Sequence, residues 1–137
     1  MNFKNTKTVT RYLISLVWLI NGLFCKVLNG VPRHQQIVSR ILGEQYASEL
    51  TVIIGFLEIG MVIWILSRFK SKLNAFFQMI IIITMNSIEL FFASDLLLWG
   101  NFNIIFALLF VTLVYYNEFL NQKKYKCYHF LKIIHLE

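Results

Sequence analysis

The stretch IIIITMNSIEL at residues 80–90 decides how this chain folds, because an asparagine and a carboxylate follow closely on four isoleucines. It lies in an apolar block that covers approximately residues 75–92 and lacks the alternation of a barrel strand. A bilayer core about 30 Å thick needs roughly 20 apolar residues per helix. We therefore predict a transmembrane helix that carries Asn86 and Glu89 within it.

Three further apolar blocks lie along the chain, at approximately residues 12–28, 50–66 and 103–119. Only 15% of the 137 residues are charged, whereas soluble domains have about 25% charged residues. Because a bilayer admits only helices and closed barrels, we predict an all-α fold: an integral membrane four-helix bundle that forms a single transmembrane domain over residues 1–137. A soluble bundle would need polar helix faces, and we expect none in the first half of the 75–92 block.

Lysine and arginine lie mainly on one side of the predicted bundle. Three segments carry most of them: Lys4, Lys7 and Arg11; Arg68, Lys70 and Lys72; and Lys123, Lys124, Lys126 and Lys132. The positive-inside rule then places both termini in the cytoplasm, with residues 121–137 as a cytoplasmic basic tail. The net charge of +6 reflects this asymmetry. We expect no nucleic-acid partner, because no basic patch is interleaved with stacking aromatic residues.

The polar residues inside the blocks lie at similar depths. A helix rises about 1.5 Å per residue, which places Lys26 roughly 3 Å and Glu89 roughly 5 Å below the outer ends of their helices. Asn86 and Glu58 follow at roughly 9 and 12 Å by the same rise. Asn103 begins the fourth helix at this end. We therefore predict a polar pocket in the outer half of the bundle and an almost wholly apolar inner half.

Helical spacing turns these residues toward one another. Trp18, Gly22 and Lys26 recur at every fourth position and share one face of the first helix. Gly55 permits the close approach of another helix, so Glu58 should face the bundle. Lys26 can compensate one buried carboxylate, and a second one should then stay protonated.

We predict that this pocket binds a ligand and moves protons. The predicted ligand-binding residues are Trp18, Gly22, Lys26, Asn86 and Asn103, and the predicted proton relay consists of Glu58 and Glu89. Ionisable residues inside a membrane are functional by default. The alternative is that hydrogen bonds among these side chains only tie the helices together.

Several other chemistries are disfavoured. Cys25 and Cys127 fall on opposite sides of the predicted membrane, so they cannot form a disulfide. His34, His129 and His135 all lie outside the predicted transmembrane helices, so no two histidines can hold a haem between the helices of the bundle. The chain has no metal-binding, Walker or Rossmann motif. We therefore expect no metal and no intrinsic cofactor.

The segment 31–49 joins the first two helices and predicts a short interfacial helix. Pro32 can start this helix and Gly43 can end it. It should lie on the outer leaflet over the predicted pocket, either as a lid or packed against the mouth of the bundle.

These features together resemble the DoxX-like family of small four-helix membrane proteins. The matching motifs are Trp18-x-x-x-Gly22-x-x-x-Lys26, Pro32, Gly55-Phe56-Leu57-Glu58, Asn86-Ser87-Ile88-Glu89 and Asn103, within roughly residues 10–120. The family takes its name from a subunit linked to thiosulfate:quinone oxidoreduction. The resemblance implies a multi-pass protein of the plasma (inner) membrane with a connection to quinone or redox metabolism.

Three functions are open on these grounds. The first is a quinone- or lipid-binding accessory component of membrane redox metabolism, with the lipid bilayer and a membrane redox partner or a homo-oligomer as partners. The second is an acid–base enzyme, of isomerase or hydrolase type, acting on a lipophilic substrate. The third is a non-catalytic assembly protein. Transport is disfavoured, because the predicted inner half offers no polar path.

Overall fold

The computed structural model describes residues 3–97 and 100–120, and the regular secondary structure in these ranges is all helical. The α-helices are α1 (Phe3–Leu19), α2 (Arg33–Leu42), α3 (Ala47–Ser67), α4 (Ser71–Phe92) and α5 (Asn103–Tyr115). Two π-helical segments, Ile20–Val27 and Tyr116–Leu120, extend α1 and α5, and two short 3-10 helices, Ser94–Leu96 and Gly100–Phe102, separate α4 from α5. The predicted tail at 121–137, with Cys127, His129 and His135, lies outside the described residues.

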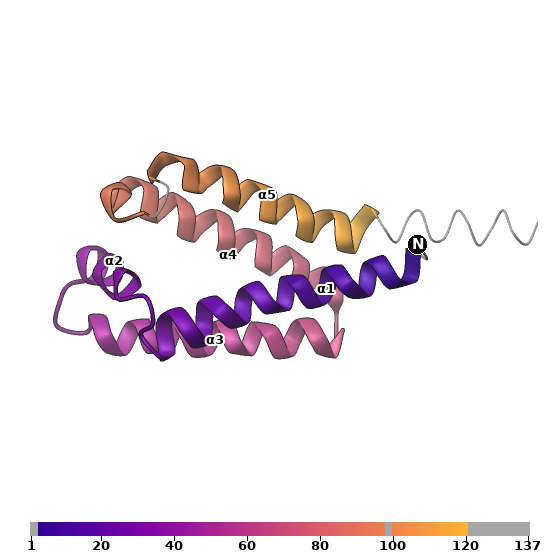
Figure 1. The fold of residues 1–137 in the computed structure, drawn as a ribbon, viewed down its shortest axis with the longest axis horizontal. Helices are drawn as coiled ribbons and strands as arrows, with labels where there is room; N and C mark the ends of the chain where they lie inside the picture. Colours follow the sequence, from indigo (N-terminus) through magenta and orange to yellow (C-terminus); the bar gives the residue numbers. More distant parts are fainter. Residues whose placement is uncertain (1–2, 98–99, 121–137) are drawn as a thin grey trace, which may run out of the picture.

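The helices form a bundle of two neighbouring pairs. α1 lies beside α3, and α4 lies beside α5, while the short α2 caps one end (Figure 1). The chain begins at the opposite end of the bundle. We call these two ends the α2 end and the N-terminal end.

The fold prediction is confirmed, because the structure has four helices long and apolar enough to cross a membrane. These candidate spans are Asn5–Val27, Ala47–Ser67, Ser71–Phe92 and Asn103–Leu120. Large apolar side chains on their outer surface are exposed, among them Leu57, Ile63 and Phe91. Apolar surface on this scale is unusual for a soluble monomer and fits contact with lipid.

The predicted interfacial helix between the first two spans is also present, as α2. Its N-cap is Pro32 and its C-cap is Gly43, which has a φ of 97°. A positive φ of this size suits glycine, which lacks a Cβ. Ile37 and Val38 are buried, and α2 packs mainly on α3 with smaller contacts to α4. α2 is therefore anchored to the bundle through one apolar face.

The backbone of α3 lies directly against the backbone of the π-helical end of the first span. A Cβ added to Gly22 would lie 2.7 Å from the carbonyl oxygen of Gly55, and a Cβ added to Gly55 would lie 2.7 Å from the carbonyl oxygen of Gly22. Small residues are typical of such membrane helix contacts, since they let two backbones approach. This contact places Lys26 and Glu58 on adjacent turns of the two helices.

The prediction of an almost wholly apolar inner half is wrong. Several polar side chains are buried in the N-terminal half of the bundle: Ser15, Asn74, Gln78, Asn117 and Glu118. α4 begins at Ser71, before the apolar block, so Asn74 and Gln78 lie one turn apart on a buried face. A hydropathy average hides them, because their helical neighbours Phe76, Phe77 and Ile80 face outward and are strongly apolar.

Candidate functional site

A cavity of about 330 Å³ lies at the α2 end, between the spans and α2. All the predicted site residues except Gly22 line it: Trp18, Lys26, Glu58, Asn86, Glu89 and Asn103. The structure thus brings together side chains from the first span, α3, α4 and α5. Gly22 is instead buried in the helix contact with Gly55. We call this space the polar cavity.

An ion pair joins the first two spans at this cavity. Lys26 Nζ donates to Glu58 Oε1 at 2.7 Å, and the two side chains are only 9% and 13% exposed. The other carboxylate oxygen, Glu58 Oε2, is buried and has no hydrogen-bond partner within the part of the chain that the structure describes. A buried acceptor without a donor is costly, so Glu58 is suited to accept a hydrogen bond from a molecule in the cavity.

A pair of asparagines joins α4 and α5 on the other side of the cavity. Asn103 Nδ2 donates to Asn86 Oδ1 at 2.8 Å, and Asn86 Nδ2 donates to the carbonyl oxygen of Ile82 at 2.8 Å. These bonds orient both amides. Glu89 lies nearly one turn beyond Asn86 on α4 and also lines the cavity.

Two residues of α2 line the cavity and were not among the predicted site residues. Arg33 and His34 both lie in its wall. Arg33 Nε is a buried donor with no partner among the groups of residues 3–97 and 100–120. The sequence did contain a signal for them, since Arg33 and His34 precede the buried Ile37 and Val38 by four positions and so share their face.

His34 is neutral in the folded protein at physiological pH. Burial, together with the positive charges of Lys26 and Arg33, lowers the pKa of His34 to about 4. Unfolded histidine has a pKa of about 6.5. Between these two values only the unfolded state binds the proton, so the free energy of unfolding should fall as the pH falls from about 6.5 toward about 4.

His34→Gln is therefore expected to remove part of this pH dependence. Unfolding of the detergent-solubilised wild type and variant can be compared at pH 7.5 and pH 5. The wild type should lose more stability than the variant on acidification. The remaining histidines are present in both proteins, so their contribution to the pH dependence of unfolding is the same in both and drops out of the difference. Equal losses would show that His34 titrates normally in the folded state.

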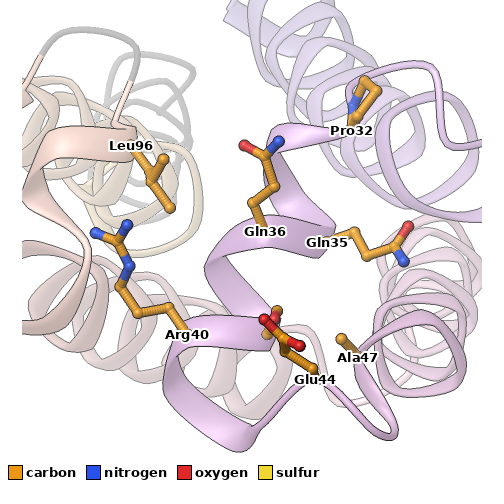
Figure 2. A pocket seen from close by; sticks show the side chains of 8 residues that line it. Pro32, Gln35, Gln36, Arg40, Glu44, Ala47 and Leu96 are labelled. Atoms are coloured by element: carbon orange, nitrogen blue, oxygen red, sulfur yellow. The ribbon is translucent and has the colours of Figure 1, made fainter.

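A larger hollow, of about 750 Å³, lies on the other side of α2 (Figure 2). Gln36 and Glu44 at its rim are exposed, and Arg40 reaches across to form an ion pair with Asp95. The hydrogen bond from Arg40 lowers the pKa of Asp95. These side chains are exposed to solvent, so a ligand in the hollow would have to compete with water for their hydrogen bonds.

Trp18 connects the polar cavity to the N-terminal half of the bundle. Trp18 is 6% exposed and lines the cavity. Its indole Nε1 donates to Gln78 Oε1 at 2.9 Å. Among the described residues, no group of three or more His, Cys, Asp and Glu side chains is placed to hold a metal ion.

Comparison with known proteins assigns the chain to a family. The family model described as the DoxX-like family matches residues 15–115. The chain belongs to the DoxX-like family. The matched segment contains every residue of the polar cavity wall named above. No curated protein and no solved structure matches this DoxX-like chain.

Family membership and the four apolar helices together identify this DoxX-like protein as a multi-pass membrane protein. The family match ends at residue 115, so the Tyr116–Leu120 segment and its buried Asn117 and Glu118 fall outside it. The named residues of the polar cavity wall thus all lie within the family's matched region.

Proposed function

We propose that this DoxX-like protein binds a quinone or quinol headgroup in the polar cavity, as an accessory component of membrane redox metabolism. The observation that carries the proposal concerns two residues that line the same cavity. Each has a buried polar atom without a hydrogen-bond partner among the described residues: the acceptor Glu58 Oε2 and the donor Arg33 Nε. A quinol hydroxyl can donate to the first, and a carbonyl or second oxygen can accept from the second.

The size and lining of the cavity support a ring-shaped amphiphile. Its volume of about 330 Å³ lies at the lower end of the range of about 300 to 1,000 Å³ for small-molecule sites. Besides its polar residues, the wall contains the apolar side chains of Val17, Ile81, Phe106 and Phe110. A headgroup would contact the polar residues, while its apolar tail would lie along the apolar side chains toward lipid.

The carboxylates give the cavity a proton acceptor for the bound hydroxyl. In the proposed function Glu58 accepts the hydrogen bond while Lys26 stabilises its negative charge, and Glu89 passes the proton onward. The electrons would go to or come from a membrane redox partner. The protein would lie in the plasma membrane with both termini in the cytoplasm, as the distribution of lysine and arginine favours.

Ligand-dependent thermal stabilisation tests this proposal. The probes are a short-chain quinol and its O,O-dimethyl ether, which has the same ring but no hydroxyl donor. At a concentration 100 times the dissociation constant, the quinol should stabilise the wild type by about 2.7 kcal/mol. Glu58→Gln should weaken quinol binding about tenfold, which corresponds to about 1.4 kcal/mol.

The dimethyl ether cannot donate to Glu58, so it is expected to stabilise the wild type less than the quinol does and to bind wild type and Glu58→Gln equally. Equal stabilisation by quinol and ether would show that the ring dissolves in the bundle without using Glu58. No stabilisation by either compound would remove quinones as the ligand class.

A second function is favoured by the position of Glu58 and Glu89 in one cavity wall. Two carboxylates in different environments can serve as acid and base toward one lipophilic substrate. Under this alternative the purified protein would isomerise or hydrate a substrate with no redox partner present. Turnover that needs a redox partner would favour the accessory role.

A further inference from the structure

The N-terminal end of the bundle contains a second cluster of buried polar side chains. Ser71 Oγ donates to Glu118 Oε1 at 2.5 Å, and Lys7 Nζ lies 3.8 Å from Glu118 Oε2. Beside them is a cavity of about 20 Å³, lined by polar side chains of Arg11, Asn74, Gln78 and Asn117 as well as by Ser71 and Glu118. We call this the small cavity.

A chain of hydrogen bonds connects the small cavity to the polar cavity. Gln78 Nε2 donates to Asn74 Oδ1 at 2.6 Å, and Trp18 Nε1 donates to Gln78 Oε1 at 2.9 Å. Gln78 lines the small cavity and Trp18 lines the polar cavity. One hydrogen bond, between Trp18 and Gln78, thus separates a polar space at one end of the bundle from a polar space at the other.

These polar groups have a plain structural explanation, because hydrogen bonds between side chains tie membrane helices together. Two observations go beyond it. Asn117 lines the small cavity and is only 5% exposed. Its Oδ1 is buried and has no partner within the described ranges. The small cavity has the volume that one water molecule needs, and its polar walls could hold that water.

We propose that the bundle contains a proton path across the membrane, in which Trp18 is the barrier between two hydrated ends. From the N-terminal end, water would reach Gln78 through the small cavity. From the α2 end, water would reach Trp18 through the polar cavity. Buried ionisable residues in membrane proteins commonly mark such paths. The path is closed in this structure, because the indole and amide side chains of Trp18 and Gln78 do not readily exchange protons.

The size of the small cavity favours protons over metal cations. Lys7 and Arg11 lie beside Glu118 at the N-terminal end, and Lys26 and Arg33 line the other end with the carboxylates of Glu58 and Glu89. The positive charges at both ends oppose every cation, including the proton. The small cavity, of about 20 Å³, has room for about one water molecule, so a hydrated metal ion does not fit, whereas a proton can move along single water molecules.

Proton flux into proteoliposomes tests the path. Vesicles containing an internal pH dye are clamped with K⁺ and valinomycin, and an external acid step is applied in the absence of any quinol. Trp18→Ala removes the barrier and should acidify the vesicles at least tenfold faster than the wild type. Trp64→Ala is the matched control, because Trp64 donates its indole N–H to the carbonyl oxygen of Phe69 and lies off the path. Vesicles with Trp64→Ala should acidify at the wild-type rate.

The double variant Trp18→Ala/Gln78→Leu distinguishes a polar path from a loosened bundle. Leucine places apolar atoms where the path needs a polar group, so the double variant should return to the wild-type rate. Only protein that elutes as a monodisperse peak is reconstituted. If Trp18→Ala does not meet this criterion, Trp18→Gln replaces the ring by a smaller polar side chain and is expected to give the same order of rates.

Two results would overturn the proposal. One is a Trp18 variant that acidifies no faster than Trp64→Ala. The other is a fast rate that persists in the presence of Gln78→Leu, which would indicate leakage around the bundle. Neither result depends on ligand binding, so the quinol proposal is judged separately by its own measurement.

Discussion

Lys26→Met is expected to destabilise the bundle by about 3 to 5 kcal/mol, because it leaves a buried carboxylate without its cation. Lys26 and Glu58 form their ion pair at 2.7 Å with both side chains almost fully buried. The free energy of unfolding can be measured by titrating denaturing detergent into protein in mild micelles. Part of the loss would be avoided if Glu58 became protonated in the variant.

The double variant Lys26→Met/Glu58→Gln should recover most of this loss, because both charges are then absent and no unpaired ion is buried. Arg40→Met is a matched control, since Arg40 is exposed and pairs with exposed Asp95. An exposed ion pair contributes little to stability, so this control should unfold as the wild type does. Equal behaviour of Lys26→Met and Arg40→Met would contradict a buried Lys26–Glu58 pair.

Gly22→Ala is expected to cost about 3 kcal/mol, at the upper end of the usual range for overpacking a tight contact. The new Cβ would lie 2.7 Å from the carbonyl oxygen of Gly55 and 2.9 Å from Glu58 Cβ. Both are held by helix backbone, so neither can move aside without shifting α3. The same shift would displace Glu58 from Lys26, and quinol binding should weaken in parallel.

Gly60→Ala provides the control in α3, the helix that Gly22 contacts, because a Cβ at Gly60 meets nothing within 4 Å. Alanine has the higher helix propensity by about 1 kcal/mol, so this variant should be as stable as the wild type or slightly more so. The measurement is the same unfolding titration. If Gly22→Ala and Gly60→Ala had the same stability, the close approach of α3 to the first span would not exist in the folded protein.

Local periodicity was sufficient to predict most of the polar cavity. Lys26, Glu58, Asn86 and Glu89 are each isolated in an apolar block, and an isolated charge or amide in lipid must face the bundle interior. Their depth followed from helix rise and from alternating helix direction. These are properties of single helices, so no knowledge of helix packing was needed.

The buried polar side chains at the N-terminal end of the bundle could not be predicted in the same way. Asn74 and Gln78 lie near the start of α4, where polar residues are usual at a membrane interface, and Asn117 and Glu118 lie near the end of the fourth span. Whether such residues face water or one another depends on which helices are neighbours. The contact between Trp18 and Gln78 joins residues 60 positions apart, and no local pattern specifies it.

The sequence by itself thus determined the four membrane-spanning helices, the interfacial helix and the shared end of the bundle at which Lys26, Glu58, Asn86 and Glu89 lie, since each depends on local hydropathy and helical spacing. Only the tertiary structure decided that Arg33 and His34 enter the cavity wall, that Gly22 serves a helix contact, and that Trp18 bonds to Gln78. The reason is physical. The apolar length of a helix and its rise depend on residues that are close together in the sequence, whereas the partner of a side chain across the bundle depends on which helix faces pack together.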